Sequence, residues 1–118
     1  MQNGAKELPE RTYQYGRRII ALFKALPENK LAQTLGLQLL RAGRSAGANY
    51  READRARTKA EFVAKMGDSL KELDESSFWL RHIRDSELLQ PNRLESLRQE
   101  TDELIRIFVA IIKKARGE

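Results

Sequence analysis

The sequence predicts an all-α protein, an up-down-up-down antiparallel four-helix bundle formed by a single domain of residues 1–118. Two compositional features point to helices: charged residues make up 33% of the 118 residues, and there are only 3 prolines. Apolar residues recur at spacings of three and four in four successive segments. Because only a few residues separate these segments, consecutive helices are expected to lie side by side and run in opposite directions.

The first helix is expected at about residues 9–26. Its apolar stripe recurs at spacings of three and four residues, and a proline then ends the helix because it cannot continue the backbone hydrogen bonds. The stripe consists of Tyr13, Gly16, Ile20 and Phe23, widened by Ile19 and Leu26, and the proline is Pro27.

The second helix, expected at about residues 29–56, carries a heptad-type seam that is rich in small residues. The seam residues are Leu35, Leu39, Ala42, Ala46, Asn49 and Ala53. Gly36, Gly43 and Gly47 lie in the same segment, and each costs about 1 kcal/mol of helix propensity relative to alanine. We expect the close approach of a neighbouring helix to offset that cost.

The third and fourth helices are expected at about residues 58–86 and 91–116. Thr58 followed by Glu61 predicts a capping box at the start of the third helix. Pro91 fits the first turn of the fourth helix, where a missing N–H is tolerated. Both segments keep apolar residues at spacings of three and four.

The basic residues concentrate in and just after the second helix. The segment 41–59 has six basic and two acidic residues, a balance of +4 in a chain of net charge +5. The basic residues are Arg41, Arg44, Arg51, Arg55, Arg57 and Lys59. At about 100° per residue, the first four of them share one face, approximately opposite the seam and about 20 Å long.

Two interpretations of this arginine face remain open. It is either a surface that binds phosphates or an acidic partner, or a solvated face whose guanidinium groups pair with Glu or Asp of a neighbouring helix. No aromatic residue alternates with these arginines in the sequence. Any nucleic-acid contact is therefore expected to go mostly to the backbone, with little reading of base sequence.

Several polar residues are expected to serve structure rather than chemistry. Asn49 lies in the seam, where a buried amide needs hydrogen-bond partners and can fix helix register. Glu52, Glu72 and Glu75 are expected to be half-buried carboxylates paired with arginines. Trp79 is expected to anchor a core or an interface, because its ring is largely apolar.

No catalytic residue, metal or cofactor is predicted. The chain has no cysteine and one histidine, His82. A di-metal bundle needs a Glu-x-x-His motif on each of two helices, and no Gly-rich phosphate loop or nucleophile motif occurs. The lack of cysteine, of a signal-peptide pattern and of a long apolar run leads us to expect a cytoplasmic protein.

The segment GRSAGANYREADRARTKAEF resembles the signature of the small four-helix-bundle proteins named for intervening sequences in bacterial 23S rRNA genes. The residues that carry the resemblance in the second helix and the following turn are Arg44, Ser45, Ala46, Ala48, Asn49, Glu52, Glu61 and Phe62. Those in the third helix are Leu70, Glu72, Glu75, Trp79 and Leu80. The similarity covers roughly residues 10–115.

This resemblance implies a homopentameric ring with a central channel and no known enzymatic activity. A related branch is the accessory protein of diversity-generating retroelements, which works with a reverse transcriptase and binds nucleic acid through a basic surface. By this similarity the arginine face would contact RNA or DNA. We therefore predict a non-enzymatic scaffold that binds nucleic acid or docks to a nucleic-acid enzyme. The alternative is a structural or protein-interaction module whose basic residues form intersubunit salt bridges.

Overall fold

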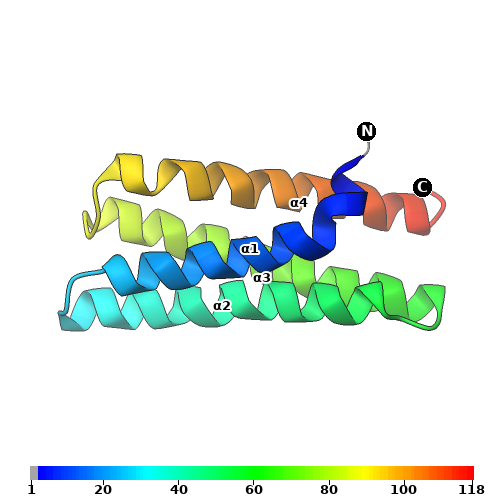
Figure 1. Cartoon of the computed structure of the whole chain (residues 1–118), viewed down its shortest axis with the longest axis horizontal. Helices are drawn as coiled ribbons and strands as arrows, with labels where there is room; N and C mark the ends of the chain where they lie inside the picture. Colours follow the sequence, from blue (N-terminus) through cyan, green and yellow to red (C-terminus); the bar gives the residue numbers. More distant parts are fainter. Residues whose placement is uncertain (1–2) are drawn as a thin grey trace.

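The computed structural model describes residues 3–118, and the regular elements in this part of the chain are all helices, with no strand. Its elements are α1 (Asn3–Ala25), α2 (Lys30–Asp54), α3 (Lys59–Asp85), the short 3-10 helix η1 (Pro91–Arg93) and α4 (Glu95–Ala115). The four α-helices lie along the long axis of a molecule that measures 45 × 24 × 22 Å (Figure 1). The prediction of an all-α fold with four helices is confirmed.

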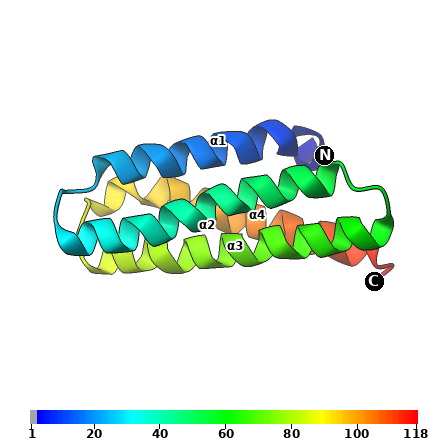
Figure 2. The ribbon, with the colours of Figure 1, turned by 90° about the horizontal axis from the view of Figure 1, so that it is seen from below.

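Contacts between α2 and α3 show that these two helices run in opposite directions. Arg41 pairs with Glu75, whereas Glu52, further along α2, pairs with Lys65, which comes earlier in α3. The two perpendicular ribbon views show the chain reversing direction at each connection (Figures 1 and 2). No helix among the described residues combines the length and the apolar character needed to cross a lipid bilayer.

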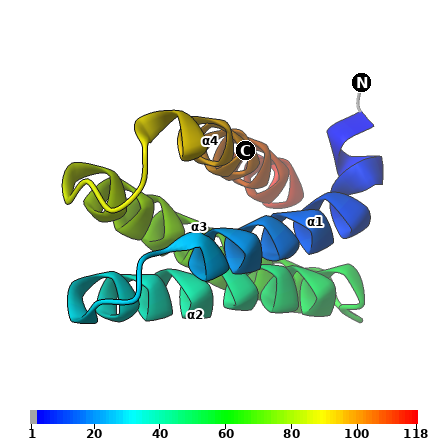
Figure 3. The ribbon, with the colours of Figure 1, turned by 60° about the vertical axis from the view of Figure 1, so that its left-hand side comes forward.

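Two helix starts differ from the sequence prediction. α1 begins before the predicted start, so Pro9 lies inside the helix. Proline lacks the N–H that would bond to the preceding turn, and the dark blue start of α1 is bent relative to the rest of the helix (Figures 1 and 3). At the other end of the chain, Pro91 opens the 3-10 turn η1, and α4 begins only at Glu95.

Side-chain caps fix the starts of α2 and α3. The Asn29 side chain accepts a hydrogen bond from the Ala32 N–H at 2.9 Å. The predicted N-cap Thr58 accepts from the Glu61 N–H at 3.0 Å. The Glu61 carboxylate accepts from the Arg57 N–H at 3.3 Å, one residue before the position that a standard capping box would give. The two caps satisfy N–H groups that have no partner within the helix.

The apolar stripe predicted for α1 is wrong in its centre. The buried side of this helix is formed by Leu8, Thr12, Tyr15, Ile19, Leu22 and Leu26. Tyr13 and Ile20, which were assigned to the stripe, are 60% and 38% exposed. The predicted stripe and the buried residues both have helical spacing, so spacing alone does not decide which of them faces the other three helices.

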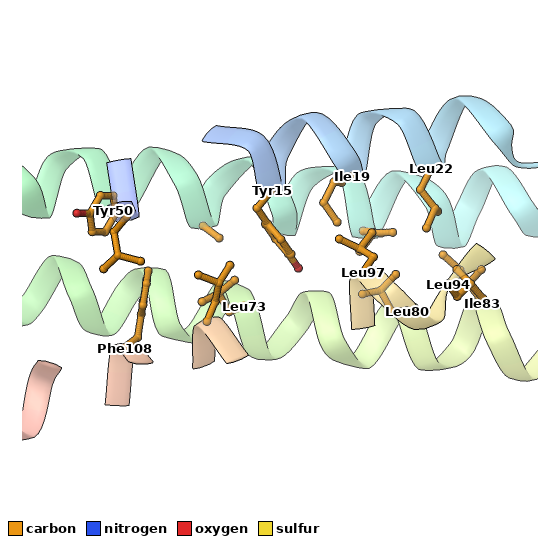
Figure 4. Close-up of a cluster of buried hydrophobic side chains, with 14 of the residues drawn as sticks. Tyr15, Ile19, Leu22, Tyr50, Leu73, Leu80, Ile83, Leu94, Leu97 and Phe108 are labelled. Carbon is orange, nitrogen blue, oxygen red and sulfur yellow. The ribbon is translucent and has the colours of Figure 1, made fainter. Parts of the chain in front are cut away.

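The core lies between all four helices and contains mainly aliphatic side chains, with Tyr15, Tyr50 and Phe108 as its aromatic members (Figure 4). The small residues of α2 let α1 approach closely, as expected. A Cβ atom placed on Gly43 would lie 2.7 Å from Ile19 Cγ1, which is too close for unstrained packing.

One buried hydroxyl pair links α1 to α4. The Tyr15 hydroxyl lies 2.7 Å from Thr101 Oγ1. Since Thr101 donates its only hydroxyl proton to the Leu97 carbonyl at 2.8 Å, Tyr15 is the donor in the pair. Burial raises the pKa of Tyr15 to about 12, because the charged phenolate is disfavoured away from water.

Candidate nucleic-acid interface

The structure divides the arginines of α2 into two groups. Arg41 leans toward α3, where its Nη2 donates to Glu75 Oε1 at 2.9 Å. The two side chains are 51% and 37% exposed, so the pair contributes at most about 1 kcal/mol to stability. For Arg41, the interpretation as an arginine paired with an acidic residue of a neighbouring helix holds.

Arg44 and Arg51 lie nearer to α1, and both border a groove of about 350 Å³ that we call the α1–α2 groove. α1 contributes Arg17 to the same groove. Figures 2 and 3 show that α1 and α2 lie side by side in both views. The complete lining comprises Pro9, Thr12, Tyr13, Gly16, Arg17, Ile20, Gly43, Arg44, Gly47, Ala48, Tyr50, Arg51 and Asp54.

Three glycines in the lining differ in what surrounds them. A Cβ on Gly43 would collide with Ile19, and a Cβ on Gly47 would be in ordinary contact, 3.5 Å from the Thr12 carbonyl oxygen. A Cβ on Gly16 would meet nothing within 4 Å. Gly43 is therefore explained by helix packing, whereas the space above Gly16 is open.

The charges of the groove are predominantly positive. Three arginines against the single carboxylate of Asp54 leave a balance of +2. Burial, and secondarily the charge of Asp54, raise the pKa of Tyr50 to about 12, so this tyrosine is neutral at physiological pH. Within the described residues, neither Arg44 nor Arg51 forms an ion pair with an acidic side chain; Arg44 Nε donates only to the Leu40 carbonyl, at 3.4 Å. These guanidinium groups are free to bind an anion.

An exposed aromatic ring stands beside these arginines. Tyr13 of α1 is 60% exposed and borders the α1–α2 groove. The sequence prediction, made along α2 alone, contained no such ring, because Tyr13 comes from another helix. The spacing of Tyr13, Gly16 and Arg17 along one side of α1 was the available signal.

The sequence matches the model of the family described as 23S rRNA-intervening sequence protein over residues 7–110. The chain belongs to this family. A crystal structure of a protein from Bacteroides thetaiotaomicron, described as a protein with unknown function from the S23 ribosomal protein family, is similar with a TM-score of 0.84. It is 31% identical, and the match covers 90% of this chain and 98% of that one. No curated protein matches the sequence.

The remaining basic residues predicted for the interface lie at the turn between α2 and α3. Arg55, Arg57 and Lys59 are all exposed. In the part of the chain that the structure describes, none of them takes part in an ion pair. They add positive charge to the turn that follows Asp54, the last residue of α2 that lines the α1–α2 groove.

The predicted structural carboxylates have different partners. Glu75 pairs with an arginine, as expected, but Glu52 is exposed rather than half-buried and pairs with Lys65 at 2.7 Å. Glu72 forms no ion pair among the described residues, and its Oε1 is buried without a hydrogen-bond partner. The prediction of arginine partners is therefore wrong for Glu52 and Glu72. Asn49 is half-buried, in agreement with its place in the seam.

A second surface feature lies on α3. Trp79 is half-buried against the core, and the ring of Phe78, 53% exposed, meets it edge to face at 4.9 Å. His82 packs on Phe78 with ring centroids 4.6 Å apart. No group of three or more potential metal ligands occurs among the described residues.

Proposed function

We propose that this chain is a non-enzymatic, cytoplasmic scaffold that binds the backbone of RNA or DNA through its basic surface. The observation that carries the proposal is the group of three arginines, Arg17, Arg44 and Arg51, at one groove. Arginine suits this role because its planar guanidinium group matches phosphate geometry.

The partner and the assembly belong to the same proposal. The resemblance to the accessory protein of diversity-generating retroelements supports docking to a nucleic-acid enzyme such as a reverse transcriptase. We further propose that the antiparallel up-down-up-down bundle assembles into a homopentameric ring. The exposed Phe78 on α3 and Leu37 on α2, 53% and 54% exposed, provide apolar surface for contact between copies.

Fluorescence anisotropy with labelled RNA and DNA over a salt series tests the binding. The logarithm of affinity is expected to fall linearly with the logarithm of salt concentration, by about 0.7 per phosphate contact on a single strand and about 0.9 on duplex DNA. The double variant Arg44→Glu/Arg51→Glu is expected to bind weakly and with a shallower slope. Arg106→Glu is the control, because Arg106 is an exposed arginine on α4. Absence of binding at low salt contradicts the proposal.

The alternative function is a structural module held by intersubunit salt bridges. It requires the basic residues to pair with acidic residues of another copy, in the way that Arg41 pairs with Glu75 within the chain. Size-exclusion chromatography with light scattering on the same charge-reversal variants separates the two functions. Loss of binding at unchanged mass supports the nucleic-acid scaffold. Dissociation of the assembly supports the structural module. A mass of one chain for the wild type contradicts the ring.

A further inference from the structure

We propose that the α1–α2 groove receives an unpaired nucleobase, so that this protein selects single-stranded over double-stranded nucleic acid. The inference rests on the proposed nucleic-acid function and specifies its substrate class. It assigns the apolar part of the groove lining, which includes Ile20 and Ala48, to the base and the bordering arginines to the phosphates on either side.

Gly16 is the first observation behind this inference. A glycine inside a helix weakens it relative to alanine. The close approach of Ile19 explains Gly43, but a side chain on Gly16 would have open space above it. A Cβ on Gly67 of α3 would also meet nothing within 4 Å, but Gly16, unlike Gly67, lines the α1–α2 groove, so the missing side chain leaves room there for a ligand on the helix backbone.

The surroundings of Gly16 fit a planar ring with charged neighbours. Tyr13 presents an exposed aromatic face at the edge of the α1–α2 groove. Stacking on such a ring holds bases of any type, and positively charged grooves beside the rings hold the backbone of single strands. Arg44 and Arg51 supply that charge. The carboxylate of Asp54 disfavours a phosphate at its own position but accepts hydrogen bonds from base amino groups.

The geometry of double-stranded nucleic acid separates this occupant from a duplex. In a duplex each base is already stacked between its neighbours, so only an unpaired or extruded base can enter a groove.

Competition anisotropy tests the selection with a short labelled RNA strand and the same strand annealed to its complement. The wild type is expected to bind the single strand at least about fivefold more tightly than the duplex, the lower end of what one stacked base contributes. Gly16→Leu fills the groove and is expected to remove this preference. Gly67→Leu on α3 is the matched control, because a Cβ there also meets nothing within 4 Å, and it is expected to behave as the wild type.

A second pair of variants keeps the test informative if leucine at position 16 disturbs the fold. Tyr13→Ala is expected to weaken single-strand binding at least about fivefold, and Tyr13→Phe to retain it, because the ring remains. Equal affinity for both forms of RNA, or unchanged single-strand affinity in Gly16→Leu and Tyr13→Ala, overturns the inference while the proposed function stands.

Two further outcomes are also decisive. Absence of binding to either form of RNA at low salt removes the proposed function, and the inference with it. Tighter binding of an acidic polyglutamate peptide than of the single strand assigns the groove to an acidic protein and overturns the inference.

Discussion

Replacing Gly43 by alanine provides a direct test of how closely α1 packs on α2. The new Cβ would lie 2.7 and 2.9 Å from the two γ-carbons of Ile19 and 3.2 Å from its β-carbon. Ile19 is branched and fully buried, so it has no room to turn away. Overpacking of this kind costs about 1–3 kcal/mol, and the better helix propensity of alanine returns about 1 kcal/mol. The expected net destabilisation is up to about 2 kcal/mol.

Gly67→Ala is the control for Gly43→Ala. It gains the same helix propensity, but no atom lies within 4 Å of the new Cβ, so the difference between the two variants measures the strain at Gly43. Urea unfolding at one fixed protein concentration is expected to place Gly43→Ala about 1–3 kcal/mol below Gly67→Ala in free energy of unfolding. In thermal unfolding this corresponds to several degrees in Tm for a chain of this length. If the two variants are equally stable, the close approach of Ile19 does not explain Gly43.

Three further predictions use the same urea assay. Because burial raises the pKa of Tyr15 from 10.0 to about 12, the unfolded state loses this proton first, and stability falls by about 1 kcal/mol per pH unit between these values. In Tyr15→Phe this contribution to the loss of stability at alkaline pH is expected to disappear. If stability depends on pH in the same way in the variant and the wild type, the prediction is contradicted. Thr58→Ala removes the cap of α3 and is expected to lose about 1 kcal/mol. Arg11→Met removes two hydrogen bonds of 2.8 Å to the half-buried Glu100, with an expected loss of about 1–3 kcal/mol that Arg11→Met/Glu100→Met partly restores.

Local signals in the sequence were sufficient for the helices and for one cap. Thr58 was predictable because a hydroxyl before an apolar run satisfies N–H groups of its own helix, whatever packs around it. The extension of α1 through Pro9 was not predictable, since proline inside a helix is disfavoured in isolation. The buried side of α1 also required the structure, because Tyr13 and Ile20 are as apolar as the residues that form the core.

The groove was not predictable because it depends on which helix lies beside α2 and at which rotation. On an ideal helix, Arg41 and Arg51 differ by only about 80°, so the sequence places them on one face. In the structure that difference directs Arg41 toward Glu75 of α3 and places Arg51 at the boundary with α1. A contribution from α1, such as Tyr13, has no signature in the sequence of α2.

The contrast between the two sides of α2 gives the physical reason to look for a ligand next to α1. On the α3 side, the basic Arg41 meets the acidic Glu75, so the charges are balanced within the chain. On the α1 side, Arg44 and Arg51 share a groove with another arginine, Arg17. Like charges gathered at one place oppose folding rather than support it. The single carboxylate of Asp54 still leaves this groove with a balance of +2, which an anion bound between the two helices would neutralise.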